Sequence, residues 1–313
     1  MPMKAVLPAL ARPLLEPHLP DSIDPHWFTT RADAQAHIAD ADIAWVDMQN
    51  PLDSAAVTAL GQRLQWLFTL RAGVDAYDTG LLKQRGTVMT NGTGINAVAV
   101  AEYAVLGILA AAKRYDEVVR LADARAWPIA APGTVELAGS SALIIGYGTI
   151  GRLIGDRLAA FGVAVTGVTR SGRYGTLTPD GWKPHIAEFD WIVLAAPSTG
   201  ATAALLGAPE FTAMKRSAWL INMARGDMID QPALIEALTA RRIAGAFLDT
   251  VDPEPLPADH PLWSTPNALH SMHLSGRSQT TMFPRAAALF LENLAAFLAG
   301  KPMRNVVDLQ AGY

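Results

Sequence analysis

The chain has 313 residues, of which 50% are hydrophobic and 17% are charged, with a net charge of −4 and no cysteine. A chain of this length exceeds one typical domain, so we expect two domains. The lack of cysteine excludes disulfides, thiolate metal ligands and cysteine nucleophiles, and the acidic balance provides no basic surface for nucleic acid or for an anionic membrane.

The apolar N-terminus is interrupted by Pro2, Pro8 and Pro13, so it lacks the unbroken apolar core of a signal peptide. The longest apolar run, Ala97–Ala112, contains Glu102 and is too short to span a bilayer comfortably, which indicates a buried helix. We therefore expect a cytoplasmic protein without a membrane partner.

The first ninety or so residues alternate short apolar segments with segments of helical composition. The expected strands are Lys4–Leu7, Ile43–Val46, Trp66–Leu70 and Thr87–Thr90, and the expected helices are Ala32–Ala39 and Ser54–Leu60. The segment Asn91-Gly92-Thr93-Gly94 then breaks the pattern, and a long helix is expected from Ala97 to about Asp123.

The second half of the chain alternates more regularly. The expected strands are Ser140–Ile145, Val163–Thr169, Trp191–Ala195, Ala218–Asn222 and Gly245–Leu248, and the expected helices are Arg152–Phe161, Pro209–Met214, Gln231–Ala240 and Ser278–Ala299. Such alternation predicts a parallel, doubly wound sheet, so the fold class is α/β, with two units of similar style.

The apolar run before residue 146 leads directly into Gly146-Tyr147-Gly148-Thr149-Ile150-Gly151, and a helix is expected to follow. Gly-x-Gly-x-x-Gly between a strand and a helix predicts dinucleotide binding. Gly146 permits the tight turn, Gly148 lets the backbone approach the pyrophosphate, and Gly151 lets the helix pack closely on the strand. The helix start offers amide hydrogens and a positive dipole end to the phosphates.

The end of the next strand indicates which dinucleotide is bound. In an NAD site, a carboxylate at this position binds the ribose hydroxyl. This chain instead has Thr169, followed by Arg170, Ser171 and Arg173. A carboxylate would repel a ribose phosphate, whereas a guanidinium can bind it with two charge-assisted hydrogen bonds. We expect NADPH to be preferred, with NADH possible; the alternative is that both arginines are ordinary solvated cations.

Three later segments place polar side chains beside expected strands. Arg225 directly follows one strand, Glu254 lies in a proline-rich loop after another, and His273 precedes the final helix. Ligands of open α/β sheets bind at such strand ends. An arginine can bind a carboxylate and polarise the neighbouring ketone, and a histidine can donate a proton near neutral pH. A hydrogen-bonded glutamate would favour the imidazolium form and fix the ring.

In this order, the segments resemble the D-isomer-specific 2-hydroxyacid dehydrogenase family, closest in style to its glyoxylate/hydroxypyruvate reductases. The shared patterns are Asn-x-Ala-Arg-Gly at residues 222–226, Asp249 with Glu254-Pro-Leu-Pro, and His273-x-x-Gly276. The resemblance also includes residues 72–75, 96–102 and 261–263, and covers the chain from about residue 65 to the C-terminus.

The resemblance implies two Rossmann-like domains with a cleft between them. Residues 1–93 and 275–313 would form the substrate domain, and residues 94–274 the dinucleotide-binding domain. Arg225, Glu254 and His273 would be catalytic, and the backbone of Ala72, Gly73 and Val74 would bind the substrate carboxylate. Besides the glycine loop and residues 169–173, the implied cofactor contacts are Ala196, Pro197, Met223, Ala224, Asp249 (near the nicotinamide) and Gly276. The implied partners are a small 2-oxo acid and a second copy of the chain, bound through the 97–123 helical region.

Two departures from the common family pattern leave the substrate open. Tyr103 stands where a histidine often follows the glutamate, and Met272 stands where proline is common. We expect NADPH-dependent reduction of glyoxylate or hydroxypyruvate. A bulkier 2-oxo acid such as phenylpyruvate is the alternative, because Trp45, Met48 and Gln49 come from a segment expected to line the pocket.

Other functions on the same fold are a non-catalytic dinucleotide-sensing corepressor or scaffold, and a formate or phosphite dehydrogenase. A metal pair of His270 and His273, one helical turn apart, would need further ligands. No third ligand or carboxylate cluster accompanies them, so no metal site is expected.

Overall fold

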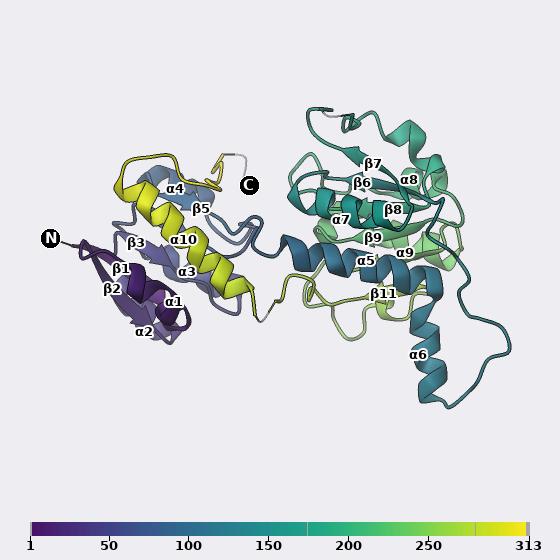
Figure 1. The fold of residues 1–313 in the computed structure, drawn as a ribbon, viewed down its shortest axis with the longest axis horizontal. Helices are drawn as coiled ribbons and strands as arrows, with labels where there is room; N and C mark the ends of the chain where they lie inside the picture. Colours follow the sequence, from purple (N-terminus) through teal and green to yellow (C-terminus); the bar gives the residue numbers. More distant parts are fainter. Residues whose placement is uncertain (1, 174, 279, 311–313) are drawn as a thin grey trace. The chain divides into compact units, whose positions relative to one another are not determined.

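The computed structural model describes residues 2–173, 175–278 and 280–310 (Figure 1). The chain forms two compact units. Met1–Asn96 and Ser278–Tyr313 form unit 1, and Ala97–Arg277 form unit 2. The chain therefore leaves unit 1 once and returns to it, with crossings after residues 96 and 277, against 93 and 274 in the sequence-based prediction.

Unit 1 is a five-stranded, fully parallel sheet covered by helices, in the order β2-β1-β3-β4-β5. Its strands are β1 (Met3–Pro8), β2 (Ile23–Phe28), β3 (Ile43–Trp45), β4 (Trp66–Phe68) and β5 (Val88–Thr90). Its helices are α1 (Arg12–Leu15), α2 (Arg31–Ile38), α3 (Pro51–Thr58), α4 (Thr79–Arg85) and α10 (Met282–Leu298). Thr30, Asn50 and Asp78 cap α2, α3 and α4 by accepting first-turn amide hydrogens.

Strand β2 was not expected, because Pro25 interrupts its apolar pattern. Proline cannot donate to a sheet ladder, but β2 is the edge strand and pairs only with β1, so the lost donor has little cost there.

Trp45 lies in the core of unit 1, so the prediction that it lines the pocket is wrong. Its ring packs between Phe68 and Phe290 of α10, with ring centroids 4.9 and 5.6 Å away. A parallel strand covered on both faces has no polar/apolar alternation, so the sequence does not show which way each side chain points. Met48 is half-buried and Gln49 is exposed.

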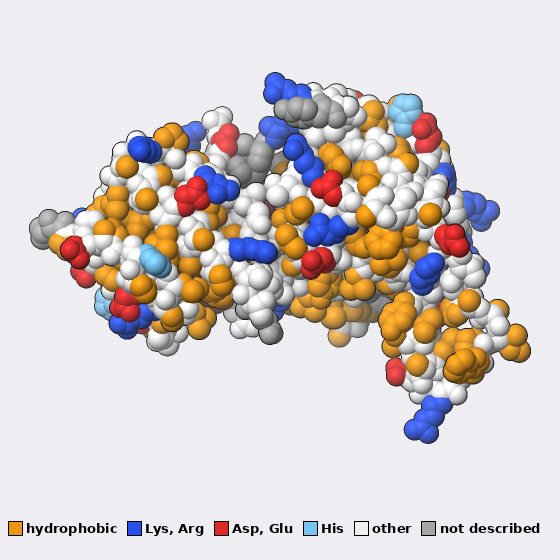
Figure 2. All heavy atoms as spheres, in the orientation of Figure 1, with side chains coloured by type: hydrophobic (Ala, Val, Ile, Leu, Met, Phe, Trp, Pro, Cys, Tyr) orange, Lys and Arg blue, Asp and Glu red, His pale blue; other side chains and the backbone are white. Residues whose placement is uncertain are grey.

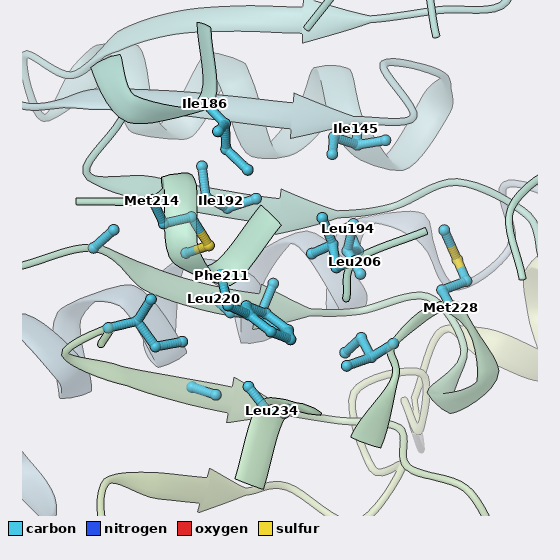
Figure 3. Packing of buried hydrophobic residues seen from close by; sticks show 14 of the residues in the cluster. Ile145, Ile186, Ile192, Leu194, Leu206, Phe211, Met214, Leu220, Met228 and Leu234 are labelled. Atoms are coloured by element: carbon cyan, nitrogen blue, oxygen red, sulfur yellow. The ribbon is translucent and has the colours of Figure 1, made fainter. Parts of the chain in front are cut away.

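Unit 2 is a six-stranded parallel sheet in the order β11-β10-β9-β8-β6-β7. The strands are β6 (Ser141–Ile145), β7 (Ala164–Val168), β8 (Trp191–Leu194), β9 (Trp219–Asn222), β10 (Gly245–Leu248) and β11 (Ala268–His270). The helices are α5 (Ala97–Lys113), α6 (Tyr115–Asp123), α7 (Thr149–Ala160), α8 (Ala208–Ala213) and α9 (Gln231–Thr239). Both faces are apolar and covered by other elements. On one of them, Ile145, Ile192 and Leu194 of the strands belong to the same buried cluster as Phe211 of α8 (Figure 3). The predicted α/β class with two parallel sheets is confirmed.

The expected single helix from Ala97 to Asp123 is wrong, because the structure has two helices that meet at Arg114. Arg114 adopts the left-handed conformation (φ 48°), and its guanidinium pairs with Asp116 and Glu117 at 3.4 and 2.5 Å. Further along the chain, the backbone at Gly133 passes so close to this helix junction that an added Cβ would lie 2.2 Å from the carbonyl carbon of Lys113. The break therefore lets a later segment pack directly on the junction.

Within the part of the chain that the structure describes, no helix combines the length and the hydropathy that a bilayer crossing requires.

Candidate active site

The glycine-rich loop follows β6, the strand from which the chain order diverges toward β7 on one side and β8 on the other. Such a switch point is where open α/β sheets bind ligands. Gly146 has a φ of 98°, and an added Cβ would lie 2.3 Å from the amide nitrogen of Ala196. An added Cβ at Gly151 would lie 2.2 Å from the Gly146 carbonyl oxygen, so neither position accepts a side chain.

Gly148 differs from these two glycines, because nothing lies within 4 Å of the place where its Cβ would be. It precedes the first turn of α7, and no side chain caps that turn. The start of α7 therefore has open space at Gly148 and no side-chain cap on its first turn, and a helix N-terminus of this kind suits a pyrophosphate. The residues present fit a dinucleotide.

Tyr147 has a packing role within this loop. Its amide donates to the Val168 carbonyl oxygen at 2.8 Å. Its ring fills the space left by Gly155 of α7 and Gly167 of β7, where added Cβ atoms would lie 2.6 and 2.4 Å from it. The ring thus sets the distance between α7 and β7.

The loop after β7 folds back on the strand. The Thr169 amide donates to the Leu177 carbonyl oxygen at 3.0 Å, and the Thr169 and Thr176 hydroxyl oxygens are 2.7 Å apart. Arg170, Ser171 and Arg173 are exposed on this loop, which contains no carboxylate from residue 169 to residue 178. The loop therefore presents cationic and hydroxyl side chains at the end of the second strand.

His273 and Glu254 come together as the sequence predicts. His273 Nδ1 lies 2.6 Å from Glu254 Oε2, and the Val251 amide donates to Glu254 Oε1 at 3.1 Å. Burial alone would raise the pKa of Glu254, but the hydrogen bond and charge of His273, the Val251 amide and the Arg225 charge together hold it below the usual range. Glu254 is therefore ionised at neutral pH and can hold the imidazole ring.

Arg225 belongs to the same region, because it follows β9, while residues 249–254 follow the neighbouring β10. The buried Asn222 side chain links the two loops by donating to the carbonyl oxygens of Arg225 (3.0 Å) and Thr250 (3.2 Å). Gly226 makes their approach possible, since an added Cβ would lie 2.0 Å from the Val251 carbonyl carbon. The sequence analysis missed the role of Asn222; a polar residue at the end of an apolar strand is the signal for it.

Asp249 is buried and holds the turn that contains His273. Its Oδ1 accepts hydrogen bonds from the Ser271 hydroxyl (2.7 Å) and from the amides of Leu274 (3.1 Å) and Ser275 (3.2 Å), and its Oδ2 accepts one from the Ser275 hydroxyl. Its carbonyl oxygen accepts from the His273 amide at 2.6 Å. Ser271 and Ser275 are further site residues that sequence reasoning missed. The remaining predicted contacts lie beside these loops: Ala196 and Pro197 follow β8, Met223 and Ala224 follow β9, and Gly276 follows Ser275.

His270 does not pair with His273. It ends β11 rather than lying on a helix, and its Nε2 lies 3.2 Å from the Leu262 carbonyl oxygen. Burial lowers the pKa of His270. A different cluster of possible metal ligands occurs among the described residues, at His26, Asp33 and His37 of unit 1. The two imidazoles are stacked with centroids 3.5 Å apart, so in this arrangement their ring planes do not meet at one ion, and each hydrogen-bonds to Asp33.

In unit 1, the predicted substrate turn Ala72-Gly73-Val74 follows β4. Asn91 Nδ2 donates to the Ala72 carbonyl oxygen at 2.8 Å, and the Gly92 amide donates to that of Arg71 at 2.8 Å. Gly92 is required there, because an added Cβ would lie 1.9 Å from the Leu70 carbonyl oxygen.

A glycine loop at the switch point, together with an arginine and a glutamate–histidine pair at neighbouring strand ends, defines an α/β dinucleotide-dependent oxidoreductase. Residues 105–275 match the family model described as D-isomer specific 2-hydroxyacid dehydrogenase, NAD binding domain, and the chain belongs to this family. The predicted family and enzyme class are thus confirmed, as is the predicted binding of a nicotinamide dinucleotide.

Curated relatives and solved structures support this assignment along most of the chain. A glyoxylate reductase/hydroxypyruvate reductase of Homo sapiens is 32% identical over 278 residues, which are 84% of this chain and 82% of that protein. A D-3-phosphoglycerate dehydrogenase of Archaeoglobus fulgidus is 29% identical over 84% of this chain, and the match spans 51% of that longer protein. The crystal structure of a D-isomer specific 2-hydroxyacid dehydrogenase family protein from Aeromonas salmonicida superposes with a TM-score of 0.88 at 28% identity, covering 99% of this chain and 100% of that one.

Proposed function

We propose that this protein reduces glyoxylate or hydroxypyruvate to the corresponding D-2-hydroxy acid, with NADPH as the hydride donor. The observation that supports catalysis is the 2.6 Å contact between His273 and the ionised Glu254, beside the strand-end Arg225. The substrate class comes from relatives named glyoxylate reductase or glyoxylate/hydroxypyruvate reductase, at about 30% identity.

Each side chain has a distinct role in this proposal. Arg225 binds the substrate carboxylate and polarises the ketone, because its planar guanidinium presents several donors and stays protonated. Bound NADPH supplies the hydride to the carbonyl carbon. His273 donates a proton to the oxygen that becomes an alkoxide, and Glu254 fixes the ring and stabilises its imidazolium form. The backbone of Ala72, Gly73 and Val74 binds the substrate carboxylate.

The proposed preference for NADPH rests on the loop after β7. Arg170 and Arg173 are exposed beside the hydroxyls of Thr169 and Ser171, where an NAD-specific site needs a carboxylate. A guanidinium at this position stabilises the additional phosphate of NADPH by charge-assisted hydrogen bonds.

We also propose a homodimer formed through α5, α6 and the segment that follows them. Hydrophobic side chains gather on the α6 region of the surface (Figure 2). The exposed hydrophobic residues there are Leu106, Tyr115, Val118, Val119, Trp127, Ile129 and Val135. Trp127 is 96% exposed, and an accumulation of exposed hydrophobic side chains supports a subunit interface here.

The test is the initial rate of NADPH and NADH oxidation with glyoxylate, hydroxypyruvate, pyruvate and phenylpyruvate. Rapid turnover of the first two acids with NADPH supports the proposal. Turnover confined to phenylpyruvate would keep the mechanism and replace the substrate. Tight NADPH binding without turnover of any of the four would instead favour a dinucleotide sensor.

A further inference from the structure

A buried carboxylate lies next to the substrate turn of unit 1. Asp47 follows β3, and its side chain is only 7% exposed. Its Oδ2 accepts hydrogen bonds from Trp45 Nε1 (2.9 Å) and the Leu70 amide (2.6 Å), and its Oδ1 accepts one from the Thr69 hydroxyl (2.7 Å). Burial raises the pKa of Asp47, while these donors and the nearby Arg71 charge oppose that effect.

Arg71 connects this carboxylate to a second loop. Its Nε lies 3.7 Å from Asp47 Oδ1, and its Nη2 donates to the carbonyl oxygens of Met48 (2.6 Å) and Gln49 (3.2 Å). The loop after β3 and the turn after β4 are therefore joined by the Asp47–Arg71 ion pair and by hydrogen bonds from Thr69, Leu70 and Arg71.

We propose that Asp47 is a positioning residue for substrate binding: with Arg71, it fixes the backbone that leads into Ala72, Gly73 and Val74. This inference rests on the proposed function, which assigns the backbone of that turn to the substrate carboxylate. Backbone amides bind an anion well only when they are aligned before it arrives. Asp47 holds Leu70 and Thr69 immediately before the turn, while Asn91 and Gly92 donate to the carbonyl oxygens of Ala72 and Arg71 where the turn begins.

A purely structural carboxylate in the same sheet serves as the matched control. Asp42 precedes β3, at the opposite end from Asp47, and its side chain is 8% exposed. It accepts hydrogen bonds from the Lys4 amide (3.0 Å), Arg63 (3.2 Å) and Gln65 (3.2 Å). Both aspartates are thus buried and multiply bonded, but only Asp47 adjoins the substrate turn.

The experiment compares Asp47→Asn with Asp42→Asn in the full chain, using glyoxylate with NADPH. We expect Asp47→Asn to raise the KM for glyoxylate about ten-fold or more, with kcat and the Kd for NADPH changed by less than about three-fold. Asp42→Asn should leave that KM unchanged. An equal KM increase in both variants, or none in Asp47→Asn, would overturn the inference.

A second pair of variants keeps the test valid if Asp47→Asn does not fold. Thr69→Val removes the hydroxyl that donates to Asp47, and Thr69→Ser retains it. The KM should rise in Thr69→Val and return toward the wild-type value in Thr69→Ser. A KM that rises equally in both variants would point to packing rather than to the hydrogen bond.

Amide exchange separates this inference from the proposed function. If the wild type reduces none of the 2-oxo acids, the proposed function fails, but exchange over residues 69–74 still reports on Asp47. Faster exchange of that segment in Asp47→Asn, and not in Asp42→Asn, would support the positioning role, whereas unchanged exchange would exclude it.

Discussion

The substitution Asp249→Asn tests whether a buried carboxylate holds the turn that contains His273, the proposed proton donor. In the wild type, Asp249 Oδ1 accepts three hydrogen bonds, at 2.7, 3.1 and 3.2 Å. An asparagine with its oxygen in that place would keep them as neutral bonds. A hydrogen bond to a charged group contributes about 1.5–3 kcal/mol and a neutral one about 0.5–1.5 kcal/mol, so these three bonds together lose roughly 3 kcal/mol, apart from any change in the Ser275 hydroxyl bond to Oδ2.

This loss is comparable to the strain that the turn contains. Met272 and His273 have φ angles of 53° and 54°, and the left-handed conformation costs an L-residue about 1–2 kcal/mol. The variant should therefore release the turn, so that His273 no longer stays fixed against Glu254. We expect kcat to fall by about ten- to a hundred-fold, because His273 would lose part of the rate gain that a positioned proton donor gives. The Kd for NADPH should change by less than about two-fold.

The assays are steady-state kinetics, NADPH titration and amide exchange over residues 271–275. Adding Met272→Gly to Asp249→Asn is the matched control, because glycine adopts positive φ without strain and should restore part of kcat. The reasoning is refuted if exchange and kcat stay at wild-type values, or if NADPH binding weakens while kcat does not change. The second result would mean that the carboxylate contacts the cofactor, as the family resemblance implies.

Four further predictions concern the other site residues and the proposed interface. His273→Gln should reduce kcat by about 100-fold or more while NADPH binding persists; wild-type turnover would remove His273 from the mechanism. Arg170→Asp should weaken NADPH more than NADH in fluorescence titrations, and an unchanged ratio would mean that the phosphate is bound elsewhere. The folded-state pKa of Glu254 is lowered, so its pairing with His273 stabilises the folded protein fully at pH values above the unfolded-state pKa. This stabilisation is lost as the pH falls through the folded-state pKa. Glu254→Gln should therefore make Tm depend less on pH in the acid range. Ile129→Asp should produce a monomer in sedimentation experiments, and a persistent dimer would exclude this surface as the interface.

The sequence predicts most strands and the cofactor loop because both depend on local patterns. Strand β6 and its glycine loop can be found from a short apolar run and three glycines, of which Gly146 and Gly151 allow close backbone approach and Gly148 borders open space. Buried parallel strands are continuous apolar runs, so the sequence shows that a strand is present but not on which face of the sheet each side chain lies. Trp45 shows this limit: its indole packs on Phe290, which is 245 positions away in the chain.

What could not be predicted depends on contacts between distant segments. The break at Arg114 follows from local ion pairs together with the passage of Gly133 against the helix junction. The hydrogen bonds of Asp47 to Thr69 and Leu70 cross from one strand end to the next, and no spacing rule relates those positions. For Arg225, Glu254 and His273, the ordered family pattern supplied the long-range information that local patterns lack.

Asp47 and Asp249 show one common way of holding two turns, at residues 69–74 and 271–275. Each is an aspartate within two residues of the end of a strand of a parallel sheet, and each accepts hydrogen bonds from the loop that follows the neighbouring strand. A carboxylate suits this position because it has several acceptor sites, whereas the amides of an irregular loop are donors without a ladder partner. Because the buried aspartates hold the backbone of these turns, the exposed side chains there contribute little to fixing it. Gln49 in the loop after β3 and Met272 in the turn before α10 are both exposed, so we expect substitutions of these side chains to remove few packing contacts.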